Sequence, residues 1–308
     1  MRNAFANTFY EAAKRDSKLC VVVADISPAG SMQKFRDEFP DRFVNTGVAE
    51  QVMIGMVAGM ALRGLRPVAY TIATFALFRP YEFVRDDLCY QNLPVTVVGI
   101  GGGVTYSTLG GTHHAMEDVS LASAIPNMKV IAPCDAAETR AATLWCLEKS
   151  NGPVYLRLGK AGEPDLTSQA PDAFEYGKVR WLKRAASKDV AILSYGPIMK
   201  TAFAVAERFE KAGAGVSVAS VHTIKPLDRE SVARALRDHK RVVVIEECVP
   251  RGGLAGHVKE IAWDTKADCT LDTFTLQDEF IHNYGSHNDL LAAHGLSADK
   301  IASRLQLA

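Results

Sequence analysis

Two hydrophobic patterns alternate along the chain. Short, nearly continuous apolar runs, typical of strands buried on both faces of a parallel sheet, occupy residues 19–24, 67–71, 95–99, 129–131 and 154–158. Segments with helical character lie between them, notably 49–62 and 81–90. Strands that alternate with helices predict an α/β domain with a largely parallel sheet.

A polar stretch without periodicity at 159–169, which contains glycine and proline, is typical of a linker. The alternation then resumes, with strands predicted at 190–195, 216–221, 241–246 and 270–274 and helices at 198–211, 228–237 and 254–262. We therefore predict an α/β fold of two doubly wound domains. The first covers residues 1–160, residues 161–185 form the linker and the entry to the second domain, and the second domain covers 186–308.

Composition and charge exclude several classes of function. Lys plus Arg and Asp plus Glu each number 35, so the formal net charge of the 308 residues is zero, and neither nucleic acid nor a membrane is expected as a partner. The longest apolar stretch, 52–62, is too short to span a bilayer, and no signal-peptide pattern is visible. The six cysteines form no C-x-x-C pair, which disfavours zinc and redox motifs. We expect a cytoplasmic protein.

Glu50 stands where a loop turns into an apolar helix, in the sequence Gly47-Val-Ala-Glu-Gln51. In the first turn of a helix a glutamate complements the helix dipole, which is one interpretation. The other is a carboxylate held at the edge of an apolar site, where it shares a proton with a ligand. Spacing alone leaves both interpretations open.

An aromatic segment follows, with Phe75, Phe78 and Tyr81 at positions i, i+3 and i+6. On a helix these side chains would form one stripe, which packs in a core or forms a wall against which a planar heterocycle stacks.

A glycine-rich segment at 99–111 leads from a predicted strand to His113 and His114. Loops at strand ends are where α/β sheets bind ligands. The spacing is not G-x-G-x-x-G, so a dinucleotide site is rejected, and adjacent histidines diverge, which disfavours a metal site. Proton transfer or substrate contact is favoured, because neutral imidazole suits proton transfer near pH 7.

Taken together, these segments resemble the C-terminal half of the transketolase family. The G-x-A-E-Q motif and the T-F-x-x-F motif are present as Gly47, Ala49, Glu50 and Gln51, and as Thr74, Phe75 and Phe78. Further matches are Leu93-Pro-Val95, Thr112-His113, Glu117-Asp118, Ile125-Pro-Asn127, Pro133-x-Asp135, Thr223-Ile-Lys-Pro-Leu-Asp228, and Glu246-Glu247 followed by Gly252-Gly253-Leu254. The likeness therefore covers nearly the whole chain.

The resemblance implies thiamine diphosphate as the cofactor. Glu50 would hydrogen-bond its aminopyrimidine and favour the imino tautomer, whose nitrogen removes the proton of the thiazolium carbon. Asp25 matches an aspartate near the cofactor, and His113 matches the histidine that faces the substrate. The pyrimidine pocket would be lined by Phe75, Phe78 and Tyr81.

The departures from the family cluster on the substrate side. The aspartate that recognises a donor hydroxyl is replaced by Leu109, and a second substrate histidine falls in the glycines at 101–103. The phosphate-binding serine becomes Ala29, and the phosphate-binding arginine becomes Lys160, which keeps the charge but loses the bidentate fork. We expect an altered sugar specificity, with substrate contacts from His113, His114, Lys160 and Ser31.

The sequence contains no G-D-G, the signature with which the family's diphosphate-binding domain holds the cofactor and its metal. The resemblance therefore implies an N-terminal partner subunit that carries this domain and holds Mg²⁺ or Ca²⁺. It also implies a shared cofactor site and an α2β2 assembly. The expected reaction, in the presence of the partner, transfers a two-carbon ketol unit from a ketose or ketose phosphate to an aldose.

Three alternatives differ from this interpretation. The β subunit of a 2-oxo acid dehydrogenase first component has the same domain order, but its glutamate motif reads P-L-C-E-Q, and its glycine-rich loop ends in H-S-Q. A non-catalytic scaffold subunit would keep the fold without activity, which the presence of Glu50 disfavours. The synthase of deoxyxylulose phosphate shares A-E-Q but is normally one long chain.

Overall fold

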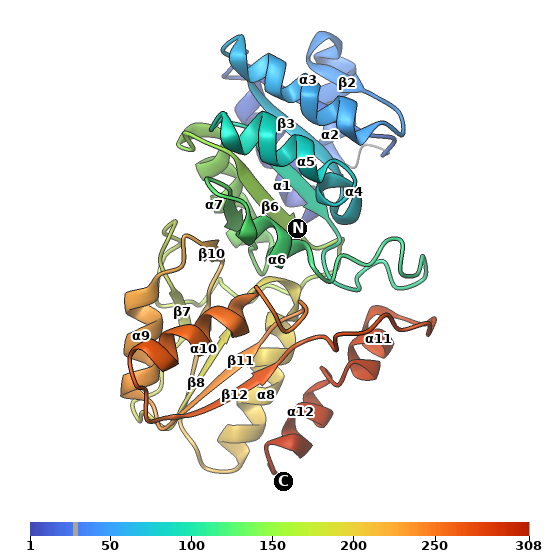
Figure 1. The fold of residues 1–308 in the computed structure, drawn as a ribbon. Helices are drawn as coiled ribbons and strands as arrows, with labels where there is room; N and C mark the ends of the chain where they lie inside the picture. The colour runs from blue at the N-terminus through green and yellow to red at the C-terminus, as the bar shows by residue number, and fades with distance from the viewer. Residues whose placement is uncertain (27–29, 308) are drawn as a thin grey trace.

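The computed structural model describes residues 1–26 and 30–307. It contains two α/β domains, drawn one above the other in Figure 1, each with a mainly parallel sheet and helices on both faces. The predicted fold class is therefore confirmed. The apolar runs of the sequence correspond to strands that are buried on both faces. Every residue of β1, β4, β6, β8 and β9 is buried, as expected for sheets covered on both sides.

The first sheet has seven strands in the order β10-β5-β6-β4-β3-β1-β2. Its parallel strands are β1 (Leu19–Val23), β2 (Phe43–Asn45), β3 (Arg66–Ile72), β4 (Thr96–Ile100), β5 (Lys129–Ile131) and β6 (Val154–Leu158). The helices around it are α1 (Arg2–Ala13), α2 (Ser31–Glu38), η1 (Pro40–Arg42), α3 (Glu50–Leu62), α4 (Ala73–Leu77), α5 (Tyr81–Phe83), the π-helix η2 (Val84–Tyr90), α6 (Asp118–Ala124) and α7 (Ala136–Glu148). Helices α1, α2 and α7 pack on one face of this sheet, and α3, α4, η2 and α6 pack on the other.

The second sheet has five strands in the order β12-β11-β8-β9-β7. They are β7 (Arg180–Lys183), which is antiparallel, β8 (Val190–Ser194), β9 (Val216–Ser220), β11 (Arg241–Ile245) and β12 (Thr270–Phe274). Its helices are η3 (Gly196–Ile198), α8 (Met199–Lys211), α9 (Arg229–Asp238), α10 (Leu254–Asp264), α11 (His287–Ala293) and α12 (Ala298–Arg304).

Strand β10 (Thr223–Lys225) belongs to the sequence of the second half but pairs with β5 of the first sheet, antiparallel to it. Lys225 anchors this crossing, because its Nζ donates to the carbonyl oxygens of Ser123 and Ile125 at 2.8 and 2.5 Å. A local pattern cannot assign a strand of three residues to a distant sheet. The domain boundaries drawn at 160 and 186 stay a prediction.

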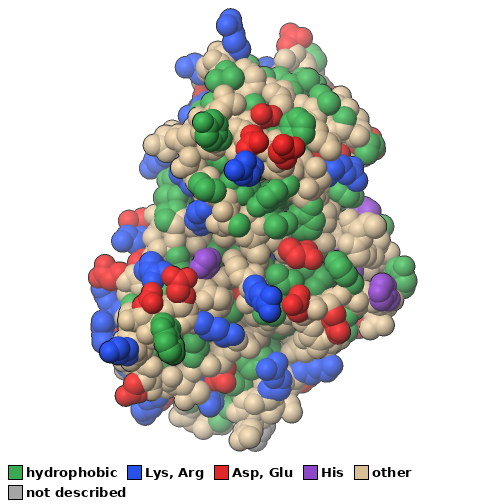
Figure 2. Space-filling view, viewed as in Figure 1, with side chains coloured by type: hydrophobic (Ala, Val, Ile, Leu, Met, Phe, Trp, Pro, Cys, Tyr) green, Lys and Arg blue, Asp and Glu red, His purple; other side chains and the backbone are tan. Residues whose placement is uncertain are grey.

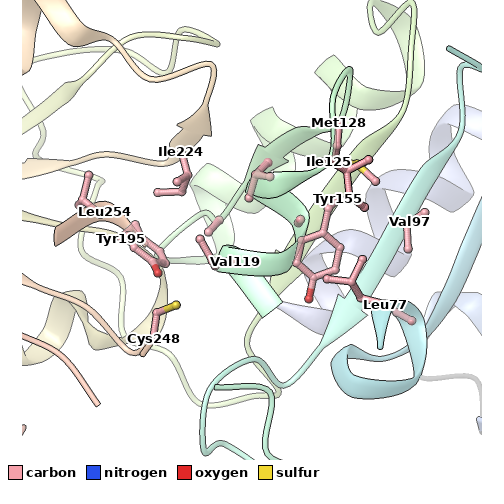
Figure 3. Packing of buried hydrophobic residues seen from close by; sticks show 14 of the residues in the cluster. Leu77, Val97, Val119, Ile125, Met128, Tyr155, Tyr195, Ile224, Cys248 and Leu254 are labelled. Carbon is pink, nitrogen blue, oxygen red and sulfur yellow. The ribbon is translucent and has the colours of Figure 1, made fainter. Parts of the chain in front are cut away.

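One apolar core runs through the junction of the two domains. Figure 3 shows Leu77, Val97 and Tyr155 of the first domain in the same cluster as Tyr195 and Leu254 of the second. Buried Arg157 ties the two parts together, since its Nε donates to Asp118 Oδ2 and its Nη2 to the carbonyl oxygen of Glu247, each at 2.8 Å. The junction is thus packed and hydrogen-bonded rather than open.

Candidate functional site at the carboxyl edge of the first sheet

The predicted site residues come from segments that leave the same edge of the first sheet. Asp25 follows β1, Phe75 follows β3, the glycine-rich loop follows β4, and Lys160 follows β6. The carboxyl ends of parallel strands meet at one edge, and ligands of α/β proteins bind there. Glu50 reaches this region from the N-terminus of α3, which follows β2.

Glu50 begins α3 and is only 2 % exposed. Nη1 of Arg79 donates to both oxygens of its carboxylate, at 2.9 and 2.8 Å. Arg79 lies just beyond α4, its side chain is 40 % exposed, and its guanidinium carbon stands 4.5 Å from the centroid of the Phe75 ring. A carboxylate at a helix N-terminus is stabilised by the helix dipole, so α3 itself favours a charged group at this point.

Beside this ion pair lies a cavity of about 530 Å³. The surface of its wall is mostly apolar, with polar groups from α4 and the residues after it, from the glycine-rich loop and from the start of α6. The wall comprises Thr74, Phe75, Phe78, Arg79, Gly111, Thr112, His114, Glu117, Leu121 and Phe280. A largely apolar cavity with a few convergent polar groups is typical of a small-molecule site. Phe75, Phe78 and His114, which the sequence singled out, are thus brought together.

The aromatic segment does not form a single helix. Helix α4 ends at Leu77 and α5 starts at Tyr81, because Pro80 between them has no N–H to continue a helix. The Tyr81 hydroxyl donates to the carbonyl oxygen of Leu121 at 3.1 Å and so holds a residue of the cavity wall. Burial raises the pKa of Tyr81, which keeps the hydroxyl protonated.

The two histidines lie differently. His113 is half-buried, with its ring edge-on to Phe75 at 5.1 Å and its Nδ1 2.9 Å from Thr112 Oγ1. His114 is buried, and its Nε2 has no hydrogen-bond partner in the part of the chain that the structure describes. Burial lowers the pKa of both, and Arg79 lowers that of His113 further. Both imidazoles are therefore neutral at pH 7 and able to accept or donate a proton.

The glycine-rich loop divides into two parts with different reasons for glycine. A Cβ on Gly102 would lie 2.3 Å from Arg157 Nε, and a Cβ on Gly103 would lie 2.3 Å from Glu247 Oε1, so the first part packs directly on the domain junction. Gly111 has open space around its Cβ position and borders the cavity. The first glycines are therefore required by packing, and only the second part of the loop faces the candidate site.

Asp25 and Lys160, like His113 and Tyr81, are not part of the cavity wall. Asp25 is exposed, with φ of 45° and its amide donating to Asn45 Oδ1 at 3.2 Å. The ammonium group of Lys160 lies 4.9 Å from the centroid of the Tyr106 ring and borders a separate small cavity of about 50 Å³. Ser31 begins α2, and the neighbouring Ala29 lies outside the described residues.

Several cavity residues were missed by the sequence analysis. Arg79 stands four positions after Phe75 in the same segment, so its basic charge beside an aromatic wall was a usable signal. Leu121 lies within α6, and Glu117, which the sequence analysis named only as a motif match, immediately precedes this helix. Burial raises the pKa of Glu117. Phe280 comes from the loop after β12 in the second domain, and no pattern in the sequence connects it with this cavity.

Within residues 1–26 and 30–307, no group of three or more His, Cys, Asp and Glu side chains is arranged to hold a metal ion. Among the same residues, no helix has both the length and the apolar character needed to cross a bilayer.

Comparison with known proteins identifies both domains. Residues 1–162 match the family "Transketolase, pyrimidine binding domain", and residues 177–301 match "Transketolase, C-terminal domain". An apulose-4-phosphate transketolase subunit of Phocaeicola vulgatus is 30 % identical over 97 % of this chain and 94 % of that protein. A 6-deoxy-6-sulfo-D-fructose transketolase subunit of a Clostridium species (strain MSTE9) is 36 % identical over 84 % of this chain and 80 % of its own length.

A solved structure described as a split gene transketolase, inactive beta4 tetramer, has the same fold. It superposes with a TM-score of 0.88 at 34 % identity and covers 99 % of this chain and 96 % of its own. The two family matches follow one another in the order of the two domains and leave little of the sequence unmatched. The chain therefore belongs to the transketolase family, of which it carries the pyrimidine-binding and the C-terminal domains.

Proposed function

We propose that the chain is the second subunit of a thiamine-diphosphate-dependent transketolase that transfers a two-carbon ketol unit from a ketose donor to an aldose acceptor. The observation that carries the proposal is the buried carboxylate of Glu50 beside an aromatic cavity of about 530 Å³. The names of the two relatives, both transketolase subunits, support the same reaction class.

The residues around the cavity fit the aminopyrimidine end of thiamine diphosphate. Phe75 and Phe78 offer flat apolar walls on which a heteroaromatic ring stacks. Glu50 lies at the end of this wall as a hydrogen-bonding carboxylate. The bound cofactor supplies the carbanion chemistry of ketol transfer, and the protein supplies position and protonation state.

The polar side of the cavity suits the sugar. His114 lines the cavity, and His113 stands next to it with its ring against Phe75. Both are neutral at pH 7, so they can hydrogen-bond hydroxyl groups and move protons at the carbonyl and hydroxyl oxygens of the substrate. Leu109, in place of the family's donor-binding aspartate, is 51 % exposed on the same loop. This substitution supports a donor sugar other than those of ordinary transketolases, and Lys160 is proposed to attract its acidic end group.

The diphosphate and its Mg²⁺ or Ca²⁺ are proposed to be held by a partner subunit with a G-D-G domain, in an α2β2 assembly. Helix α3 supports a partner, because it is apolar on nearly all sides, whereas a helix at the surface of a lone subunit has a polar face. Exposed Val48, Val52 and Leu62 lie on or next to it, with Phe83 close by in α5. Figure 2 shows apolar side chains on this face of the upper domain, interspersed with acidic and basic ones.

Calorimetry of thiamine diphosphate binding with Mg²⁺ tests the proposal. The samples are this chain alone, the candidate partner alone, their mixture, and the mixture with Glu50→Gln. We expect tight binding only in the mixture, and ketol transfer that is lost in Glu50→Gln. A mixture that forms a complex but binds no cofactor would instead favour a scaffold subunit.

The substrate part of the proposal needs a separate assay. Fructose 6-phosphate, xylulose 5-phosphate and modified ketoses are compared as donors with the assembled complex, with pyruvate as the donor for the dehydrogenase alternative. We expect modified ketoses to be preferred. Rates with the two ordinary donors that equal those of a conventional transketolase would contradict the altered specificity alone.

A further inference from the structure

Glu50 is fully paired within this chain. A carboxylate with 2 % exposure loses its hydration and requires hydrogen-bond donors, and Arg79 supplies them to both oxygens at 2.9 and 2.8 Å. A guanidinium has no acceptor and stays protonated in proteins, so in this pair both carboxylate oxygens act as acceptors. The group that the proposed function assigns to the cofactor is therefore occupied by a protein side chain.

Arg79 is placed so that it can leave. Its side chain is 40 % exposed, whereas Glu50 is buried, and it lies just beyond the short helix α4. Its planar guanidinium also faces the Phe75 ring at 4.5 Å and forms part of the wall of the 530 Å³ cavity. Among the described residues, Glu50 is its hydrogen-bonding partner, so a rotation about its side chain breaks no other hydrogen bond.

Arg79 and the aminopyrimidine of the cofactor would compete for the same carboxylate oxygens of Glu50. A heteroaromatic ring that stacks in the cavity and hydrogen-bonds Glu50 needs at least one oxygen that Arg79 now holds. We propose that Arg79 is a displaceable cap, which satisfies Glu50 while the chain lacks cofactor and turns away when the aminopyrimidine enters. Arg79 is a positioning residue here, because it acts through Glu50, and the proposal rests on the proposed function.

The cap has a measurable consequence for affinity. A binding-competent state that is populated only in a fraction of molecules weakens the apparent affinity by that fraction. If the uncapped state is about one molecule in ten, removal of the cap tightens cofactor binding about tenfold. The same removal leaves Glu50 buried without a partner in the cofactor-free chain, which lowers its stability.

The test compares Arg79→Met with Arg85→Met. Arg85 is a matched control, because it is an exposed arginine on the neighbouring η2 that pairs with Asp86. Two quantities are measured: the unfolding temperature of this chain alone, and the dissociation constant of thiamine diphosphate for the complex with the partner. We expect Arg79→Met to lower the unfolding temperature of the free chain and to lower the dissociation constant of thiamine diphosphate about tenfold. Arg85→Met should change neither quantity.

The outcomes separate the two proposals. If the wild-type complex binds no thiamine diphosphate, the proposed function fails and the cap fails with it. If the wild-type complex binds but Arg79→Met leaves the affinity unchanged or weakens it, the cap alone is overturned. If Arg79→Met does not fold, Arg79→Lys takes its place, because lysine keeps the positive charge but lacks the two-pronged guanidinium. Arg79→Lys is expected to tighten cofactor binding by a smaller factor, and weaker binding would overturn the cap. In a chain that already carries Glu50→Gln, Arg79→Met should no longer lower the unfolding temperature. If it lowered this temperature as much as it does in the wild-type chain, the cap would also be overturned.

Discussion

Glu50 and Glu246 are both buried glutamates at helix N-termini, one in each domain, and they are held in different ways. Glu246 follows β11, is 0 % exposed and accepts hydrogen bonds from the amides of Leu254 and Ala255 at the start of α10, and from the Tyr195 hydroxyl, at 2.8 to 2.9 Å. Glu50 is paired through the half-exposed side chain of Arg79. Backbone donors are fixed by the fold, whereas an arginine side chain can rotate away.

The carboxyl edges of the two sheets are filled to different extents. In the second domain the carboxyl edge is filled by its own side chains, and Gly253 is needed because a Cβ there would lie 2.4 Å from Glu246 Oε2. The anion that a glycine pair before a helix can bind is thus the protein's own carboxylate. In the first domain the corresponding edge leaves a cavity of about 530 Å³.

The largest expected contrast between the two glutamates is in the kcat of ketol transfer when each carboxylate is replaced by an amide. Glu50→Gln should lower the kcat of ketol transfer by about 10²–10⁴-fold, the usual range for loss of a positioned proton-sharing group. Glu246→Gln should leave kcat within a few-fold, because Glu246 lies away from the cavity. The measurement is turnover of the assembled complex at saturating cofactor, and equal losses in the two variants would remove the distinction between them.

Truncation of the two glutamates to alanine should affect stability in the opposite order, with the larger loss at Glu246. Glu246→Ala leaves three buried donors without an acceptor, so the free energy of unfolding should fall by about 3–5 kcal/mol. Glu50→Ala should cost less, because Arg79 can turn to solvent. Denaturant unfolding of the free chain measures both, with Glu246→Gln as the control that keeps one acceptor. A smaller loss for Glu246→Ala than for Glu50→Ala would contradict this assignment.

The two parts of the glycine loop can be compared by alanine substitution. Gly103→Ala should lower the free energy of unfolding by about 1–3 kcal/mol, because the added Cβ meets Glu247 at 2.3 Å and φ is +66°. Gly111→Ala, at a position with open space, should leave it nearly unchanged. The same unfolding assay applies, and similar losses at both positions would show that the loop is packed throughout.

The filled edge also contains an ion pair that depends on pH. Burial alone would lower the pKa of His287, but the Glu247 carboxylate, 2.7 Å away, raises it above the usual 6.5. A raised folded-state pKa adds stability that is complete below 6.5 and is lost as the pH rises through the folded-state value. The stability difference between wild type and His287→Gln should therefore shrink from pH 6 to pH 9, and a constant difference would exclude this linkage.

Phe280 gives the smallest expected effect and links the two regions. It is 66 % exposed, so Phe280→Ala should change the free energy of unfolding by less than about 0.5 kcal/mol. Because Phe280 forms part of the cavity wall, Phe280→Ala should change the KM of the sugar or the affinity for the cofactor a few-fold. Tyr284→Ala, at a similarly exposed position of the same loop, is the control. Kinetics of Phe280→Ala that equal those of the wild type would mean that Phe280 does not contribute to the site.

The sequence by itself determined the local elements and their chemistry. Strands in both domains follow from apolar runs, since a run buried on both faces needs no alternation. The start of α3 follows from the change at Ala49 to Gln51 from a polar loop to an apolar segment, which puts Glu50 at the helix N-terminus. Phe75 and Phe78 line the cavity, but their contact with a cofactor stays a prediction, as does the contribution of Asp25, Ser31 and Lys160.

Only the tertiary structure decided which distant residues meet. Strand β10 joins the first sheet, Phe280 reaches the cavity from the second domain, and the glycines at 102 and 103 pack on Arg157 and Glu247. Local periodicity reports which face of an element is buried, but not what covers it. The pairing of Arg79 with Glu50 spans 29 positions and forms because a buried carboxylate takes the nearest donor that the folded chain offers.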